Sequence, residues 1–384
     1  MRRVLLFFLI QLCPLACYSH GVRDDALLEI HYINVGQGGS TLILGPNGTS
    51  IIYDFGNYSG LTHILPYLKR SPSFSKDRGF DYAFLSHNHR DHFMGYKEFV
   101  ENGWQINVAN YDNGADKSEE GLLKSHWLDP AKSTNAGPVR PVPIGLSISL
   151  GNSAELIVVG ARGKILGRDE DVRITNENDN SIALLIRYGN FHFILDGDLG
   201  GGPDSCTQHV TKQKNIQSLV AKTLIDLALI PKEFGVDVMH IAHHGSESST
   251  THDYYNQMKP EVGLMSIGLK NRRYQHPKKS VVETVLLRPI HGGCVKALPL
   301  SLLLQTEDGE IKSAEDAKVV SNAGLSVGDI LLKTNGLRDY TIEVSGRVSE
   351  GSEVETPTGY WLCALDEVVT DNSAVCQIQS ADVN

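Results

Sequence analysis

Three histidines and one aspartate fall within six positions in the segment 86–92, which reads SHNHRDH. In an extended chain, side chains two residues apart point the same way, so His87 and His89 can bind one metal ion together. Asp91 and His92 follow where we expect the chain to turn into a helix, and they can face a second ion nearby. Imidazole nitrogens and carboxylate oxygens are ligands that zinc accepts. The segment therefore predicts a metal site rather than a polar surface loop.

The elements that must position this segment follow from hydrophobic spacing. Period-two alternation and β-branched residues predict strands, and apolar residues every three to four positions predict helices. Because the two types alternate along the chain, we expect a layered α/β fold. The expected strands are 27–35, 41–44, 50–53, 81–85, 147–150, 155–159, 181–188, 190–195, 236–241, 330–333 and 340–344; the expected helices are 63–69, 216–229, 254–258 and 280–287. Residues 101–142 and 291–325 are expected to be largely irregular.

The HxHxDH string resembles the second motif of the metallo-β-lactamase superfamily, and this resemblance implies an αββα sandwich. Asp54, at the end of a predicted strand, resembles the first motif, an aspartate that braces the metal loop. Asp198 resembles the fourth motif, a carboxylate that bridges both metals, although its neighbour Asp196 is an alternative. His243 and His244 resemble the fifth motif, which supplies a ligand to the second metal, and the resemblance does not choose between them.

The third motif departs from the family pattern. The stretch 176–181, which precedes the strand before Asp198, reads NENDNS and contains no histidine. The resemblance then leaves the first metal to His87, His89 and Asp198, together with a substitute oxygen ligand or water. We expect two divalent ions, with zinc favoured by the ligand types and manganese as the alternative.

A narrower resemblance is to the hydrolase domain of ComEC-type DNA-uptake proteins, over roughly residues 29–345. It rests on the opening VGQGGS at 35–40, on Asn180-Ser181, on HHGS at 243–246 and on NRRYQHP at 271–277. Gly39 stands where that family usually has an acidic residue. The membrane channel of a full ComEC protein has no counterpart in this sequence.

The function that we expect is hydrolysis by water activated between two metal ions. Asp91 is the expected catalytic group that orients this water or takes its proton. His276 is the second expected catalytic residue, because it can hydrogen-bond a phosphate or protonate a leaving group. Basic residues surround His276, and arginine binds phosphate oxygens well. We therefore expect substrate contacts at Asn271, Arg272 and Arg273.

These residues favour a phosphodiesterase or nuclease acting on DNA or RNA. The same centre also serves hydrolysis of a lactone, a thioester or a β-lactam, and a secreted binding protein with a degenerate site is a third reading. The net charge of −10 argues against broad coating of nucleic acid, but it is compatible with a local basic groove. The sequence does not indicate the oligomeric state.

The N-terminus predicts export, to the periplasm or the outside of the cell. Arg2 and Arg3 precede an apolar run at 4–12, and small residues follow at 16–19. We expect a signal peptide over residues 1–20, a hydrolase domain over 21–346 and a small β-rich appendage over 347–384. No later stretch is long and apolar enough to predict a stable membrane span.

The cysteines beyond the expected signal number four, an even count that favours disulfides in an exported chain. Cys363 and Cys376 flank a short hairpin-like stretch, so we pair them, and Cys206 with Cys294 follows by elimination. The sequence does not settle this connectivity.

Overall fold

The computed structural model describes residues 26–57, 61–115, 121–206, 208–268, 274–278, 280–282, 300–307 and 325–345, together with strands at 359–364 and 376–380. The expected signal peptide lies outside these residues. Within them, no helix is both long enough and apolar enough to cross a membrane.

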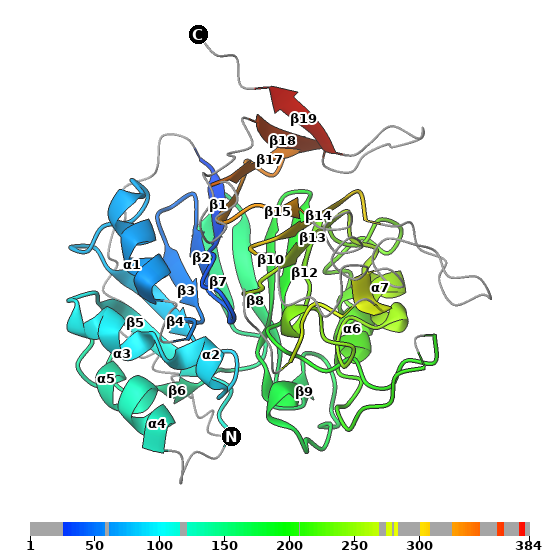
Figure 1. Ribbon diagram of the computed structural model, residues 1–384, viewed down its shortest axis with the longest axis horizontal. Coiled ribbons are helices and arrows are strands. Elements are labelled where there is room, and N and C mark those ends of the chain that lie inside the picture. The colour runs from blue at the N-terminus through cyan, green and yellow to red at the C-terminus, as the bar shows by residue number, and fades with distance from the viewer. Residues whose placement is uncertain are drawn as a thin grey trace, which may run out of the picture.

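Two β-sheets pack face to face (Figure 1). Among the described residues, the first sheet has ten strands in the order β19-β18-β17-β16-β1-β2-β3-β4-β5-β6, and the second has the order β15-β14-β13-β12-β11-β10-β8-β7 with β9 paired to β8. The first-sheet strands are β1 (Leu28–Tyr32), β2 (Thr41–Leu44), β3 (Ser50–Tyr53), β4 (Phe80–Phe84), β5 (Ile106–Asp112), β6 (Arg140–Pro141), β16 (Ile330–Thr334), β17 (Asp339–Val344), β18 (Gly359–Ala364) and β19 (Cys376–Ser380). The second-sheet strands are β7 (Ser147–Gly151), β8 (Ala154–Ala161), β9 (Lys164–Ile165), β10 (Ala183–Tyr188), β11 (Phe191–Leu195), β12 (Val238–His240), β13 (Val262–Met265), β14 (Leu302–Gln305) and β15 (Leu325–Ser326).

Helices cover the outer faces of both sheets, α1, α3, α4 and α5 on one side and α6 and α7 on the other (Figure 1). The helices are α1 (Leu61–Arg70), α2 (Arg90–Phe93), α3 (Tyr96–Glu101), α4 (Gly121–Leu123), α5 (Asp129–Ala131), α6 (Gln217–Asp226) and α7 (His252–Met258), with a π-helical turn at Lys124–Leu128 and 3-10 turns at Glu177–Asn180 and His243–Gly245. The expected α/β fold with an αββα layer order is therefore confirmed.

Three hydrophobic clusters hold these layers together, one between the sheets and one under each helical layer. Strand β10 shows how the sequence builds them. Leu184 and Ile186 point into the cluster between the sheets, and Leu185 points to the helical side. Successive strand side chains face opposite ways, so a strand buried on both faces is apolar throughout. Burying each of these side chains contributes about 1.5–3 kcal/mol.

The structure also contains strands that the sequence patterns did not predict. Strand β5 lies within residues 101–142, and β14 lies within residues 291–325, both of which we expected to be irregular. At the C-terminus, β18 pairs with β17 and β19 pairs with β18, so the two strands extend the first sheet. Whether residues 347–384 form a separate unit stays a prediction.

Within each sheet, the carboxyl ends of the parallel strands lie at the same edge. Strands β3, β4 and β5 run parallel in the first sheet, and β11, β12 and β13 run parallel in the second. Ligand sites in α/β proteins form at the carboxyl ends of such strands. The segments that follow β3, β4, β11 and β12 carry Asp54, the HxHxDH string, Asp198 and the histidine pair.

Candidate metal centre

Asp54 braces the HxHxDH loop from the end of β3. Its Oδ1 accepts a hydrogen bond from the backbone N–H of Ser86 at 2.7 Å, and its Oδ2 accepts one from Ser86 Oγ at 2.7 Å. The same Oδ2 lies 2.7 Å from His92 Nδ1. A carboxylate can only accept, so it holds the proton of His92 on Nδ1 and leaves Nε2 free to bind a metal. Asp54 thus holds both the backbone of this loop and the His92 ring, and its supporting role for a bound metal stays a prediction.

Asp198 lies at the centre of the histidines, and its two carboxylate oxygens face different sets. Oδ2 is 3.6 Å from His87 Nε2 and 3.7 Å from His243 Nε2. Oδ1 is 3.6 Å from His92 Nε2 and 3.8 Å from His244 Nε2. Ligand atoms around a tetrahedral zinc ion are about 3.4 Å apart, given bonds of about 2.0–2.1 Å. These spacings therefore suit a carboxylate that bridges two ions.

Asp91, His92 and His244 form one candidate ion group, with ligand atoms within 4.8 Å of one another. His244 Nε2 lies 3.6 Å from Asp91 Oδ2, and His92 Nε2 lies 4.0 Å from Asp91 Oδ1. Within the described part of the chain, His92 Nε2, His244 Nε2 and Asp198 Oδ1 are buried and have no hydrogen-bond partner. Buried polar atoms are rarely left unpaired, so this convergence fits a cation.

His87, His89 and Asp198 form the other candidate group. His87 Nε2 is 2.9 Å from His89 Nδ1, so the two rings converge as the spacing of two residues predicted. His87 Nδ1 lies 3.0 Å from Ser86 Oγ, which orients the ring from behind. The residues present thus form two candidate cation groups, and binding of an ion by both of them stays a prediction.

The turn after β12 places the two adjacent histidines on different sides of Asp198. His243 and His244 both have left-handed backbone conformations, with φ of 52° and 55°. His244 Nδ1 lies 2.8 Å from the carbonyl oxygen of Ser266, after β13, so Nε2 is the nitrogen that faces the site. The alternative bridging residue, Asp196, points elsewhere, because its Oδ2 accepts hydrogen bonds from Gln217 at 2.7 Å and Tyr254 at 3.1 Å.

No family model matches the chain. It is 29% identical over 108 residues to ComE operon protein 3 of Bacillus subtilis (strain 168), a match that covers 28% of this chain and 11% of that protein. It is 24% identical over 265 residues to Recombination protein 2 of Haemophilus influenzae, covering 66% of this chain and 26% of that protein. The chain thus matches only a minor part of the length of these curated relatives.

Similar solved structures include YhfI of Bacillus subtilis, titled a metallo-beta-lactamase fold protein. It is 10% identical, with a TM-score of 0.36, over 62% of this chain and 85% of that one. Another is Tm1679, titled a metal-dependent hydrolase of the beta-lactamase superfamily, which is 14% identical with a TM-score of 0.34 over 64% and 90% of the two chains. The layer order and the ligand groups at the strand ends decide the assignment. This chain has the metallo-β-lactamase fold.

The electrostatics of this metallo-β-lactamase-fold centre favour charged carboxylates. Burial disfavours the charged form of Asp198, but the surrounding histidines outweigh it and hold the pKa of Asp198 well below its usual range. Burial likewise opposes ionisation of Asp91, and His244 and His92 lower the pKa of Asp91 below its usual value. Both carboxylates are therefore ready to bind cations at neutral pH.

The histidines differ according to their neighbours. Burial opposes the charged form of His92, but Asp198 and Asp54 outweigh it and raise the pKa of His92 well above its usual value. Against the same effect of burial, Asp198 and Asp91 raise the pKa of His244. Burial and the nearby His92 lower the pKa of His87 well below its usual value. Burial lowers the pKa of His243 to about 4, against the attraction of Asp198. A neutral imidazole is the form that binds a metal.

His276 joins the centre from the loop after β13. Its ring centroid lies 5.4 Å from that of His243 and 6.3 Å from that of His244, and its buried Nδ1 has no hydrogen-bond partner among the described residues. The backbone N–H of Lys278 donates to the carbonyl oxygen of Gly245 at 2.9 Å, which ties this loop to the histidine turn. The other expected substrate contacts, Asn271, Arg272 and Arg273, lie outside the described residues.

Sequence reasoning missed several residues that position the ligands. They are Ser86, Ser248 and Ser266, which contact ring nitrogens of the histidines or carry a carbonyl that does, and Asn178, whose Nδ2 lies 3.2 Å from His243 Nε2. Serines in loops are common, so their type gave no signal. Gly38 was quoted only as part of a motif, yet a Cβ there would lie 2.2 Å from the carbonyl oxygen of Asp91.

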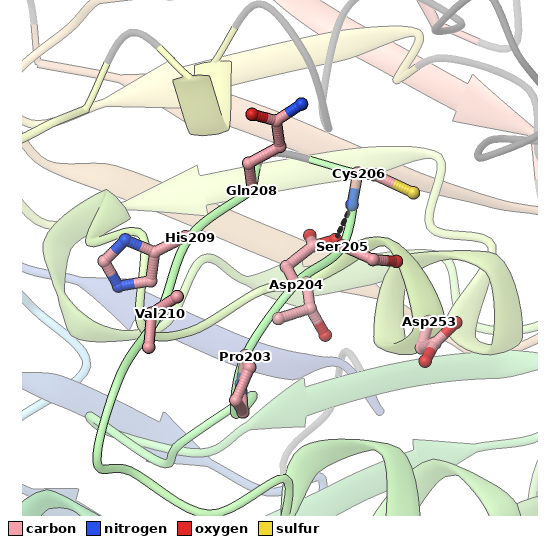
Figure 2. A pocket seen from close by; sticks show the side chains of 9 residues that line it. Pro203, Asp204, Ser205, Cys206, Gln208, His209, Val210 and Asp253 are labelled. Atoms are coloured by element: carbon pink, nitrogen blue, oxygen red, sulfur yellow. Dashed lines mark hydrogen bonds between the residues drawn. The ribbon is translucent and has the colours of Figure 1, made fainter.

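A separate group of metal-binding residue types lies where the loop between β11 and α6 meets the start of α7, beside a hollow of about 320 Å³ (Figure 2). It consists of Asp204, Cys206 and His252. Asp204 Oδ2 lies 2.7 Å from His252 Nδ1, and Asp204 Oδ1 accepts from the backbone N–H of Cys206 at 2.8 Å. Cys206 is disulfide-bonded, so its sulfur is not available as a thiolate. The expected partner Cys294 lies outside the described residues, and that pairing stays a prediction.

Proposed function

We propose that this chain is a metal-dependent phosphodiesterase that acts as a nuclease on DNA or RNA. The observation that carries the proposal is the place of the loop 274–278, which sets His276 against the two histidines of the candidate metal centre. The sequence puts a run of basic residues on either side of His276. Cationic side chains beside a di-metal centre suit a phosphate group better than an uncharged ester or amide.

When bound, two divalent ions act as Lewis acids and lower the pKa of a water molecule from about 15.7 to near 7. The residues of the chain orient the water and bind the substrate. Asp91, with a quarter of its side chain exposed, orients the attacking water or accepts its proton. Burial and the nearby His244 and His243 lower the pKa of His276 to about 3, so this ring is neutral at pH 7. A neutral imidazole with one N–H favours donating a hydrogen bond to a phosphate oxygen over protonating a leaving group.

The resemblance to ComEC-type proteins and the similarity to Recombination protein 2 support a nucleic-acid substrate. Because the net charge of −10 repels a polyanion on average, we propose that binding is local, at the loop around His276. Zinc is the metal that we propose, with manganese as the alternative.

The test is incubation of the purified chain with single- and double-stranded DNA, RNA and bis(p-nitrophenyl) phosphate in zinc, manganese or magnesium. We expect metal-dependent cleavage that Asp91→Ala abolishes, and a raised KM in Lys278→Ala. Lys222→Ala is the matched control, because Lys222 is exposed on α6 and pairs with Asp226. Hydrolysis of nitrocefin or a lactone without phosphodiester cleavage would favour the alternative function, hydrolysis of a lactone, a thioester or a β-lactam. Absence of any hydrolysis with all three metals contradicts the proposal.

We also propose that the chain is exported and that its cysteines are oxidised. The basic start and the apolar run at 4–12 support export. Cys363 and Cys376 occupy opposite positions in the β18–β19 register, which suits the proposed cross-link. Fractionation of expressing cells and non-reducing peptide mapping test both points, and a full-length chain with free thiols in the cytosol would contradict them.

A further inference from the structure

The first metal group lacks one protein ligand that the family pattern supplies. The sequence has no histidine between positions 126 and 192. The carboxylates of the stretch 176–181 accept hydrogen bonds from elsewhere. Glu177 Oε1 accepts from the backbone N–H of Asn88 at 2.8 Å, and Asp179 Oδ2 accepts from the backbone N–H of Lys214 at 2.9 Å. Asp179 Oδ1 has no hydrogen-bond partner among the described residues, but it lies against Gly200, and neither carboxylate belongs to the group of His87, His89 and Asp198.

Asp198 shows where the missing ligand must lie. Oδ1 faces His92 and His244, which belong to the second group. Oδ2 faces His87 at 3.6 Å and His243 at 3.7 Å. His243 therefore lies on the side of Asp198 that belongs to the first ion, although it is adjacent in sequence to a ligand of the second.

The His243 ring is held in an orientation that suits a ligand. Its Nδ1 lies 3.1 Å from Ser248 Oγ, which leaves Nε2 on the side of Asp198. Its backbone N–H donates to the carbonyl oxygen of Gly197 at 3.1 Å, which ties the histidine to the turn that carries Asp198. Its left-handed backbone, with φ of 52°, is uncommon for a residue with a Cβ and is a feature often kept for function.

We propose that His243 replaces the absent third-motif histidine, so that the histidine pair divides between the two ions. The first ion then has His87, His89, His243 and Asp198 Oδ2, and the second has Asp91, His92, His244 and Asp198 Oδ1. This assignment rests on the proposed di-metal centre. Asn178 Nδ2 lies 3.2 Å from His243 Nε2, so this amide must give way when the ion binds. An imidazole is also a better zinc ligand than an amide.

Metal binding without substrate tests the assignment. The chain is stripped with a chelator and titrated with Zn²⁺ or Co²⁺, with stoichiometry and affinity measured by calorimetry and the Co²⁺ d–d absorption. We expect two equivalents for the unsubstituted chain. His243→Ala should weaken one site by more than about 100-fold, because even the loss of an outer-shell partner costs about 10–100-fold. His244→Ala should weaken the other site, and His126→Ala, on the half-exposed π-helical turn, should change neither.

A rescue sharpens the test, because Asn178 lies where a new imidazole can reach the same point. His243→Ala combined with Asn178→His should recover the second equivalent, whereas Asn178→Ala alone should keep both. His243→Asn, which tolerates the left-handed backbone, serves if the alanine variant does not fold. The assignment is overturned if His243→Ala binds two ions with unchanged affinity, if Asn178→Ala loses an equivalent instead, or if the unsubstituted chain binds fewer than two. Inactivity toward phosphodiesters, by contrast, bears only on the proposed function.

Discussion

Replacing Asp54 with asparagine tests whether the brace sets the hydrogen-bonding state of His92. The substitution preserves volume, and asparagine tolerates the left-handed φ of 63° at this position. The backbone N–H of Ser86 can only donate, so it keeps the amide oxygen at the Oδ1 position. The amide NH₂ must then lie beside His92 Nδ1, where the carboxylate oxygen stood at 2.7 Å.

The consequence is a changed tautomer. An NH₂ group donates to His92 Nδ1, so the ring proton moves to Nε2, the atom that faces Asp198 Oδ1 at 3.6 Å. A protonated Nε2 cannot bind a cation. Loss of such outer-shell partners lowers metal affinity by about 10–100-fold, or about 1.4–2.8 kcal/mol at 1.4 kcal/mol per tenfold. We expect this loss at the site that contains His92, with the fold retained.

Competition with a chromogenic chelator measures the two affinities separately. Asp81→Asn is the matched control, because Asp81 is also buried and accepts a hydrogen bond from the backbone N–H of Ser50 at 2.8 Å, but at the other end of β4. It should lower the free energy of unfolding and leave both metal affinities unchanged. If Asp54→Asn binds both ions as tightly as the unsubstituted chain, the tautomer argument is wrong.

Two further predictions concern backbone packing and pH. Gly38→Ala places a Cβ 2.2 Å from the carbonyl oxygen of Asp91 and should abolish tight binding of one ion. Gly36→Ala, at a φ of 69° with open space around it, should lower the free energy of unfolding by only about 1–2 kcal/mol. Metal titration and urea unfolding distinguish the two variants, and equal effects would contradict the packing argument. Burial opposes ionisation of Asp204, but hydrogen bonds from His252 and neighbouring N–H groups outweigh it and lower the pKa of Asp204. Its contribution to stability is therefore present above the unfolded value of about 3.9 and is lost as the pH falls through the lower folded value. The difference in urea midpoint between the metal-free chain and Asp204→Asn should narrow between pH 5 and pH 3, and a constant difference would refute this.

The sequence predicted those elements whose pattern is local. Strands β2 and β3 were expected at 41–44 and 50–53, and they occupy these residues. Strand β13 was missed because it is short, buried and parallel, so its side chains do not alternate between apolar and polar. Gly263 further obscures it, although a Cβ there would lie 2.8 Å from Leu300. The glycine leaves room for side chains from segments distant in the sequence, which a local pattern does not reveal.

The sequence predicted which residue types form the candidate centre, but it did not predict how their side chains are arranged around Asp198. The spacing of His87 and His89 sufficed to place them together. Adjacent residues such as His243 and His244 share the same local sequence, and only the left-handed turn directs their Nε2 atoms to different oxygens of Asp198. The choice of Asp198 over Asp196 likewise depends on the contacts of Asp196 with α6 and α7, which lie far along the chain.

The centre also joins the two halves of the sandwich. The HxHxDH loop follows β4 of the first sheet, whereas Asp198 and the histidine pair follow β11 and β12 of the second. Cations bound here would hold the two sheets together. The free energy of unfolding would rise with ion concentration, because a ligand that binds only the folded state adds RT ln(1 + [L]/Kd) to its stability. In a chain without ions, local unfolding should then occur first where the ends of β4 and β11 meet at the centre. Amide hydrogen exchange at the ends of β4 and β11 would register that opening before the outer helical layers respond.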